Sequence, residues 1–257
     1  MNQAGLRASF GVAAVLAAAC VSGNARAQGV DMFGPYGGLE HHRFIRTKQE
    51  VAFEVRFGPY APNIDQDIPG QPYKEIFGND TRWQGGAELD WQLYRIPRVL
   101  SLGPGFGFGY THASGKAPLT NGTGTSAQST TLGIFPMHLV AALRFDYIAD
   151  HTPVPLQPYA KLGLGYALWW SSIGDSATHY NGDVGKGASY GYVWALGVVL
   201  RLDPLEPAAA ANADASLGIN HAGLFIEWFN SSLNGFGSSS GMEVGTNTWV
   251  TGLTLEI

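Results

Sequence analysis

Residues 83–94 read WQGGAELDWQLY. Apolar side chains occupy positions 83, 87, 89, 91 and 93. Polar side chains, Glu88 and Asp90 among them, occupy positions 84, 88, 90 and 92 between them. A period of two indicates a β-strand with one apolar face and one polar face. The fold therefore depends on which of these two faces meets water.

The same alternation recurs along the chain and predicts eight strands, over residues 51–57, 83–93, 100–110, 135–147, 161–170, 190–202, 221–228 and 248–257. The connections after the first, third, fifth and seventh strands are long and polar, whereas those after the second and fourth are short or contain proline. Long loops at one end and tight turns at the other are typical of outer-membrane barrels.

The composition favours a membrane barrel over a soluble β-sandwich, which is the alternative. Only 14% of residues are charged, against about 25% in a typical soluble domain. The polar strand faces consist largely of glycine, as at alternate positions from Gly103 to Gly109, and such a face is a poor surface for water. We therefore predict an all-β fold, an eight-stranded antiparallel up-and-down transmembrane β-barrel.

Eight strands enclose a lumen that side chains just fill, so the charged residues of the polar faces are expected to point inward. The predicted lumen charge network comprises Glu54, Arg56, Glu88, Asp90, Arg144, Asp146, Lys161, Arg201, Glu227 and Glu256. We interpret it as a structural plug of paired charges, with a gating role in a selective pore as the alternative.

Aromatic residues on the apolar faces are expected to lie at the membrane interfaces. Trp83 and Trp91 would stand about 20 Å apart along the membrane normal in a tilted strand, close to the spacing of two aromatic belts. The predicted girdle residues are Trp83, Trp91, Tyr110, Trp170, Tyr190, Trp228 and Trp249.

Residues 1–27 have the layout of a secretory signal peptide, with Arg7, an apolar run over residues 10–21 and small residues before the end. We predict cleavage after Ala27, with lipidation at Cys20 as the alternative. Cleavage after Ala27 would remove the single cysteine, so we expect no disulfide in the mature protein.

The mature chain is expected to contain one domain, with residues 28–48 as an N-terminal periplasmic segment and residues 49–257 as the barrel. Residues 203–218, DPLEPAAAANADASLG, interrupt the pattern after the sixth strand. Asp203 could cap a helix there and Gly218 could end it. We predict a short periplasmic helix.

Five segments spread over most of the mature chain carry a resemblance: FGPYAPNID (57–65), PYKEIFG (72–78), GAELDWQLYRIP (86–97), TPVPLQPYAKLGLGYALWW (152–170) and LGINHAGLFIEW (217–228). Together they resemble an uncharacterised family of outer-membrane β-barrel proteins from myxobacteria and related proteobacteria. The resemblance implies the fold and the location, and no catalytic residues. The sequence departs from barrel proteins in general at its end, where Ile257 replaces the common terminal aromatic residue.

His112 and Ser114 share one face near the outer rim of the predicted third strand, as in lipid-modifying barrel enzymes that use a His and a Ser. A triad also needs an acid that orients the histidine, and the sequence names none. We interpret the two residues as ordinary loop residues, with an outer-leaflet lipid-modifying enzyme as an alternative function.

Two groups of potential metal ligands have unsuitable spacing. His41 and His42 are adjacent and would point apart in an extended chain. Asp175, Asn181 and Asp183 lack the spacing of a defined cation loop. We expect no metal and no cofactor.

These observations predict a non-enzymatic barrel in the outer membrane of a Gram-negative bacterium, with a role in envelope structure or surface-loop interactions. A narrow small-solute pore is a further alternative. Expected partners are outer-membrane lipid, lipopolysaccharide and the barrel-insertion machinery, with the protein as a monomer. The net charge of −5 and the lack of a basic cluster argue against nucleic acid.

Overall fold

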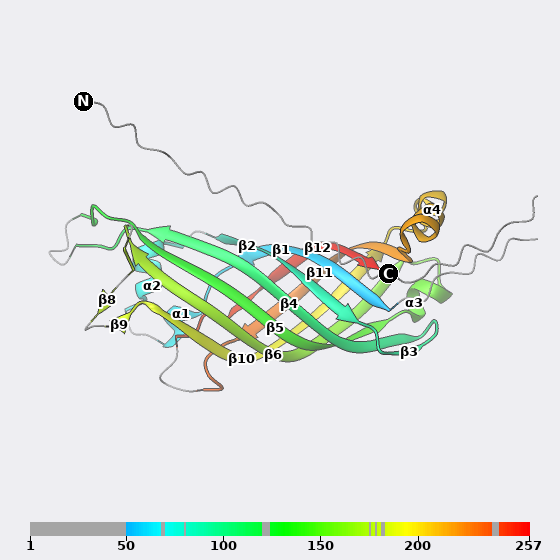
Figure 1. The fold of residues 1–257 in the computed structure, drawn as a ribbon, viewed down its shortest axis with the longest axis horizontal. Coiled ribbons are helices and arrows are strands. Elements are labelled where there is room, and N and C mark those ends of the chain that lie inside the picture. The colour runs from blue at the N-terminus through cyan, green and yellow to red at the C-terminus, as the bar shows by residue number, and fades with distance from the viewer. Residues whose placement is uncertain are drawn as a thin grey trace, which may run out of the picture. The chain divides into compact units, whose positions relative to one another are not determined.

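The computed structural model describes residues 50–257, except residues 68, 69, 80, 120–123, 175, 178, 181, 182 and 238–241. Eight long strands dominate it: β1 (Val51–Tyr60), β2 (Arg82–Trp91), β4 (Leu100–Gly115), β5 (Thr130–Phe145), β6 (Leu156–Ile173), β10 (Lys186–Arg201), β11 (His221–Ser232) and β12 (Thr246–Glu256). Each strand pairs antiparallel with the next, and β12 pairs with β1 (Figure 1). The predicted barrel is confirmed, and the sandwich alternative is wrong because the strands close into one ring.

Long connections lie at one end of the barrel, here called the loop end. They join β1 to β2, β4 to β5, β6 to β10 and β11 to β12. The elements within them are α1 (Ile64–Asp67), α2 (Pro72–Phe77), β7 (Ser176–Ala177), β8 (His179–Tyr180) and β9 (Asp183–Val184). Figure 1 shows α1 and α2 at this end, beside the last residues of β4.

The opposite end, here called the turn end, carries the remaining connections. They contain β3 (Tyr94–Ile96), α3 (Tyr147–His151) and α4 (Pro207–Leu217). The start of β1 and the end of β12 also lie at the turn end. The N–H of Glu50 donates there to the carbonyl of Ile257 at 2.8 Å. The predicted signal peptide and the segment 28–48 lie outside the described residues.

The predicted helix between the sixth and seventh long strands is α4, but it begins four residues later than Asp203. The carboxylate of Asp203 instead accepts hydrogen bonds from the ring of His221 and the N–H of Ala222. Pro207 takes the first helical position, where a missing N–H is harmless. Gly218 ends the helix as predicted, in the left-handed conformation with φ 71°.

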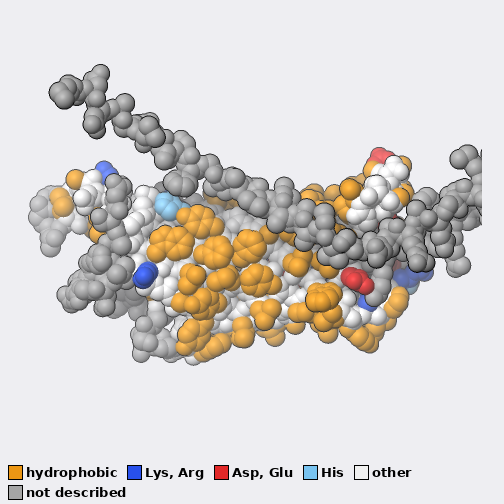
Figure 2. Space-filling view, in the orientation of Figure 1, with side chains coloured by type: hydrophobic (Ala, Val, Ile, Leu, Met, Phe, Trp, Pro, Cys, Tyr) orange, Lys and Arg blue, Asp and Glu red, His pale blue; other side chains and the backbone are white. Residues whose placement is uncertain are grey.

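Side chains alternate between the lumen and the outer surface along every long strand. The register pairs Glu54 with Glu88 and Val55 with Ala87, so inward residues of β1 lie beside inward residues of β2. Leucines that point outward are exposed, and Leu162, for example, is 66% exposed. Figure 2 shows hydrophobic side chains across the middle of the barrel and charged side chains near its two ends. No described helix is long and apolar enough to cross a membrane.

The glycines of β4 leave the space that the lumen side chains occupy. A Cβ at Gly105 would overlap the carboxylate of Asp90, and one at Gly107 would overlap the imidazole of His138. The glycine row therefore follows from crowding inside the barrel, as the sequence predicts.

Candidate functional site

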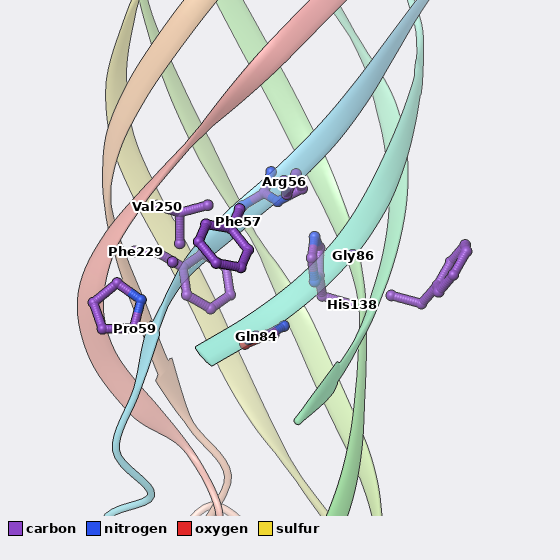
Figure 3. Close-up of a pocket in the computed structure, with 10 residues that line it drawn as sticks. Arg56, Phe57, Pro59, Gln84, Gly86, His138, Phe229 and Val250 are labelled. Carbon is purple, nitrogen blue, oxygen red and sulfur yellow. The ribbon is translucent and has the colours of Figure 1, made fainter. Parts of the chain in front are cut away.

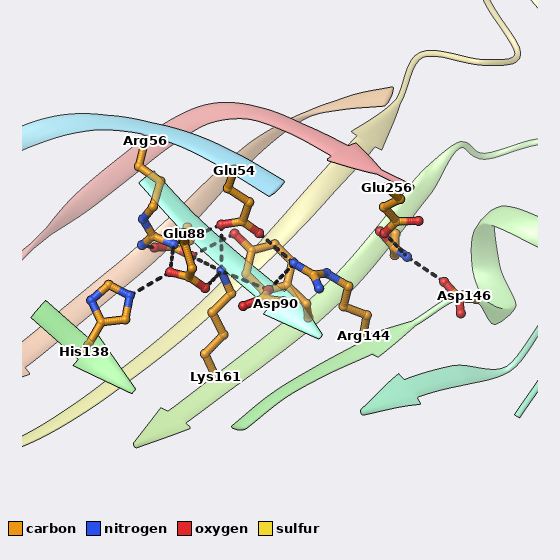
Figure 4. A network of polar contacts seen from close by, with 12 residues as sticks. Glu54, Arg56, Glu88, Asp90, His138, Arg144, Asp146, Lys161 and Glu256 are labelled. Atoms are coloured by element: carbon orange, nitrogen blue, oxygen red, sulfur yellow. Dashed lines mark hydrogen bonds and ion pairs between the residues drawn. The ribbon is translucent and has the colours of Figure 1, made fainter. Parts of the chain in front are cut away.

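Four carboxylates and three permanent cations meet in the middle of the lumen. They belong to Glu54, Glu88, Asp90 and Glu227 and to Arg56, Arg144 and Lys161. Each of the seven residues is 7% exposed or less. Together with His138 and Tyr159 they form what we call the central network (Figure 4).

Lys161 and Arg144 each contact two acids within hydrogen-bonding distance, and Asp90 and Glu227 lie 4.0 and 3.8 Å from Lys161. The Nζ of Lys161 lies 2.8 Å from Oε2 of Glu54 and 2.6 Å from Oε1 of Glu88. The Nη2 of Arg144 donates to Oε1 of Glu54 at 2.7 Å and to Oδ2 of Asp90 at 2.5 Å. Several partners per charge are needed here, because removing an ion from water costs roughly several kcal/mol.

Arg56 extends the central network toward β11. Its guanidinium donates to Glu54 at 3.0 Å and also to Glu88 and Glu227. The same group lies 5.5 Å from the ring centroid of Phe229, within the range of a cation–π contact. The cation is thus held by carboxylates and by an aromatic ring.

Two members of the central network were not among the predicted lumen residues. The Nε2 of His138 lies 2.7 Å from Oε2 of Glu88. The hydroxyl of Tyr159 donates to Oε2 of Glu227 at 2.8 Å, and its ring lies 5.0 Å from the Nζ of Lys161. His138 shares strand parity with Arg144, and Tyr159 shares it with Lys161, so their inward direction was available from the sequence.

A second group, the turn-end network, contains Arg95, Asp146, Asp150, Gln157, Arg201 and Glu256. Arg201 donates to Oδ1 of Asp146 and to Oδ1 of Asp150, both at 2.7 Å. Gln157 also donates to Asp146, at 2.5 Å, and to Glu256 at 3.4 Å. The structure buries all ten predicted lumen residues but divides them between two networks, with Asp146, Arg201 and Glu256 in the second.

The loop end is closed by apolar side chains. The buried cluster there comprises Tyr60, Ile64, Phe77, Ala113, Leu132, Ile134, Ala167, Leu233 and Val244. Ile64 and Phe77 come from the β1–β2 connection and Leu233 and Val244 from the β11–β12 connection, so these two connections fold over the barrel opening. The hydroxyl of Tyr60 donates to the carbonyl of Val244 and joins β1 to the second connection.

A small cavity lies beside the central network on its loop-end side (Figure 3). Its volume is about 20 Å³, room for about one water molecule. Arg56, Gln84, His138 and Phe229 are among the residues that line it. A void of this size is no passage for solutes.

The predicted girdle residues lie on the outer surface, and six of the seven lie in the loop-end half of their strands. Trp83 and Trp249 are 57% and 53% exposed. Trp91 is 56% exposed and lies at the turn end, where Tyr94 and Tyr147 are also exposed.

The remaining chemistry candidates do not form a site within the described residues. His112 and Ser114 are both exposed, and no described carboxylate is hydrogen-bonded to His112. His41, His42, Asp175 and Asn181 lie outside the described residues, as does the side chain of Asp183.

Three lumen acids have the spacing of potential metal ligands. Carboxylate oxygens of Glu54, Glu88 and Asp90 lie within 4.8 Å of one another. The three cations of the central network already pair with these oxygens, so the arrangement is that of an ion-paired cluster.

The closed antiparallel barrel buries its charged side chains inside and exposes a belt of apolar side chains outside. A soluble protein has the opposite arrangement, with apolar side chains inside and charged ones on the surface. Lipid is the solvent that such a belt requires, and closed barrels leave no unpaired strand edge in it. The chain is a β-barrel of the outer membrane. The central network accordingly lies inside the apolar belt of this barrel.

A scan against protein-family models gives no match, and a search of curated proteins gives none either. Several solved outer-membrane structures are similar to the chain at low identity. Ail of Yersinia pestis, solved with the heparin analogue sucrose octasulfate, is 10% identical over 81% of this barrel's chain and 97% of its own, with a TM-score of 0.43. OprG of Pseudomonas aeruginosa is 13% identical over 82% and 97%, with a TM-score of 0.42. The outer membrane enzyme PagL is 12% identical over 80% and 99%, with a TM-score of 0.38. These likenesses concern the fold alone.

Proposed function

We propose that this protein is a non-enzymatic barrel with a closed lumen, whose role lies in envelope structure or in interactions of its loop end. The observation that carries the proposal is the filling of the lumen at three levels. The turn-end network, the central network and the loop-end cluster follow one another along the barrel. An eight-stranded barrel with such a filling has no room for an aqueous channel.

Liposome swelling tests this closure against the small-solute pore. Vesicles loaded with the protein and placed in isotonic arabinose should swell no faster than protein-free vesicles. A porin in the same lipid is the positive control, and heat-modifiable gel mobility shows that the barrel is folded. Swelling above the protein-free rate would support the pore instead.

The absence of catalysis is supported by the surroundings of His112, to which no described carboxylate is hydrogen-bonded. Lipid A from cells that produce the protein should therefore have the same mass spectrum as lipid A from cells without it. A mass shift that disappears in Ser114→Ala would support the lipid-modifying enzyme.

We further propose that residues 1–27 are removed on export from a Gram-negative cytoplasm and that residues 28–48 lie in the periplasm. We propose that the chain is related to the uncharacterised family of barrels from myxobacteria and related proteobacteria that the five segments resemble. Its partners would be lipid, lipopolysaccharide and the insertion machinery, and the barrel would act as a monomer. N-terminal sequencing of the membrane-extracted protein should begin at Gln28, and a start at a modified Cys20 would support lipidation.

A further inference from the structure

A cavity of about 520 Å³ lies at the loop end, beside α1 and α2. This volume is within the range of about 300–1,000 Å³ that small-molecule sites occupy. Four side-chain amides line it, from Asn63, Gln66, Gln71 and Asn79. It shares no lining residue with the lumen cavity near the central network.

The walls of this cavity, here called the loop-end pocket, are fixed by contacts within the connection. The carboxylate of Asp65 accepts hydrogen bonds from the N–H groups of Tyr73 and Lys74, at 2.7 and 3.0 Å. The ring of Tyr73 packs on Phe77, with centroids 5.1 Å apart. Since Phe77 is buried in the loop-end cluster, the pocket is anchored to the barrel and largely pre-formed.

The amides retain hydrogen-bonding capacity. Gln66 donates to the amide oxygen of Asn63 at 3.1 Å, and Lys74 donates to the amide oxygen of Gln71 at 3.3 Å. A carboxamide offers two N–H groups and two lone pairs, so each of these amides can make further bonds. Paired donors and acceptors of this kind match the hydroxyl groups of a sugar.

Gln71 stands in an unusual conformation at the rim. Its φ of 54° and ψ of 53° are left-handed, which residues other than glycine seldom adopt. Such conformations persist where the surrounding structure holds them, and they are common at ligand clamps. Here the conformation sets the direction of the Gln71 amide at the start of α2.

The charges of the pocket favour neither an anion nor a cation. The carboxylate of Asp65 is engaged by backbone N–H groups, and the ammonium of Lys74 is the basic group beside it. The hydroxyl of Tyr73 keeps its proton at neutral pH, because phenols ionise near pH 10 and burial raises the pKa of Tyr73 further. The lining is thus neutral overall and rich in both donors and acceptors.

We propose that the loop-end pocket binds a neutral carbohydrate. The inference rests on the proposed role of the loop end in interactions and specifies the class of ligand. Carboxamides would bind the sugar hydroxyls, and Tyr73 would supply a flat apolar surface for a ring. The sugar could belong to the neutral O-chain of lipopolysaccharide or to a glycan from outside the cell.

Saturation-transfer NMR on the folded protein tests the proposal. The detergent must lack a sugar headgroup, so an alkyl phosphocholine is used in place of a maltoside. The probes are maltotriose, cellotriose, chitotriose and neutral O-chain released from lipopolysaccharide by mild acid. At least one probe should give a signal that falls at least fivefold in both Asn63→Ala and Gln71→Gly. Glycine at position 71 keeps the left-handed backbone and removes only the amide.

Gln128→Ala, which removes an exposed amide from the β4–β5 connection, is the matched control and should leave the signal unchanged. Binding of the O-chain alone assigns the ligand to the cell's own surface, and binding of a trisaccharide assigns it to free or foreign glycans. Failure of all four probes, or retention of the signal in either variant, would overturn the inference. If the vesicles exclude arabinose but the protein binds none of the probes, the proposal of a closed lumen stands and the proposal of a sugar site fails.

Discussion

Lys161 of β6 reaches Glu54 of β1 across the lumen, with 2.8 Å between Nζ and Oε2. Three strands separate β1 from β6 in each direction around the ring, so the two residues belong to opposite walls. One ion pair therefore spans the interior at the level of the central network.

Replacing Lys161 with methionine should destabilise the barrel strongly. Glu54 and Glu88 would each lose a buried partner, and breaking a buried pair typically costs about 3–5 kcal/mol. The free energy of unfolding in urea, measured in micelles, reports the loss. Lys186→Met removes an exposed lysine from the loop end and should change stability by less than about 1 kcal/mol. Similar losses in the two variants would contradict a packed lumen.

Gly107→Ala and Gly85→Ala form a matched pair on opposite faces of the wall. A Cβ at Gly107 would overlap His138, whereas a Cβ at Gly85 has no neighbour within 4 Å. Overpacking should cost about 1–3 kcal/mol at position 107 and little at position 85. Urea unfolding of both variants measures the difference. Equal stability of the two would show that the inner face has space to spare.

Substitutions of two similarly exposed leucines test whether lipid surrounds the barrel. Leu162 in β6 is 66% exposed and Leu205 at the turn end is 69% exposed. Leu162→Arg should lower the free energy of unfolding in lipid vesicles by about 2–4 kcal/mol, because the charge would face hydrocarbon. Leu205→Arg should have almost no effect. If both substitutions are neutral, the belt is not immersed in the bilayer.

The contact between Asp203 and His221 predicts a pH dependence at the turn end. Burial would raise the pKa of Asp203, but the hydrogen bond and charge of His221 and the N–H of Ala222 lower it below its usual 3.8. A lowered folded-state pKa stabilises the fold above pH 3.8, and this contribution is lost as the pH falls through the folded-state value. The stability difference between the parent and Asp203→Asn, followed by thermal unfolding between pH 2 and 5, should therefore shrink as the pH falls through the folded-state pKa of Asp203. A difference independent of pH would rule the contact out.

Most of the strands and of the side chains that fill the lumen could be predicted from the alternation of apolar and polar residues alone. Glu88 and Asp90 share parity within one strand, and the opposite parity carries Trp83 and Trp91, so one strand already decides which face is inside. Glycine at alternate positions of β4 indicated crowding on the inner face. These signals are local, since each depends on residues two positions apart.

The pairing of the charges could not be predicted, because alternation gives the face of a residue and not its height in the barrel. Glu54 meets Lys161 only because the stagger of the ring brings β1 and β6 to the same level. Phe225 and Phe229 point inward although they are apolar, and only their shared parity with Glu227 indicates this, because apolar residues stand on both faces of LFIEWF. The β1–β2 connection reads as a polar loop, yet its Ile64 and Phe77 close the barrel through contacts with distant strands.

The Glu88→Gln, Asp90→Asn double variant shows whether the central network is a gate or a plug. It should unfold at lower urea concentration than the parent, since Arg56, Arg144 and Lys161 lose charged partners. If the double variant still inserts into a bilayer but conducts no current, the central network is a plug whose stability has been reduced. Stable currents in the double variant alone would make the network a gate.

The most direct test of the closed lumen is the conductance of the unmodified protein in a planar bilayer. Insertion is verified by recovery of heat-modifiable protein from the same lipid, and a porin provides the positive control. The central network, the turn-end network and the loop-end cluster predict no steady current steps above the bare membrane at any applied voltage. Reproducible stepwise currents from the inserted, folded protein would contradict the closed lumen.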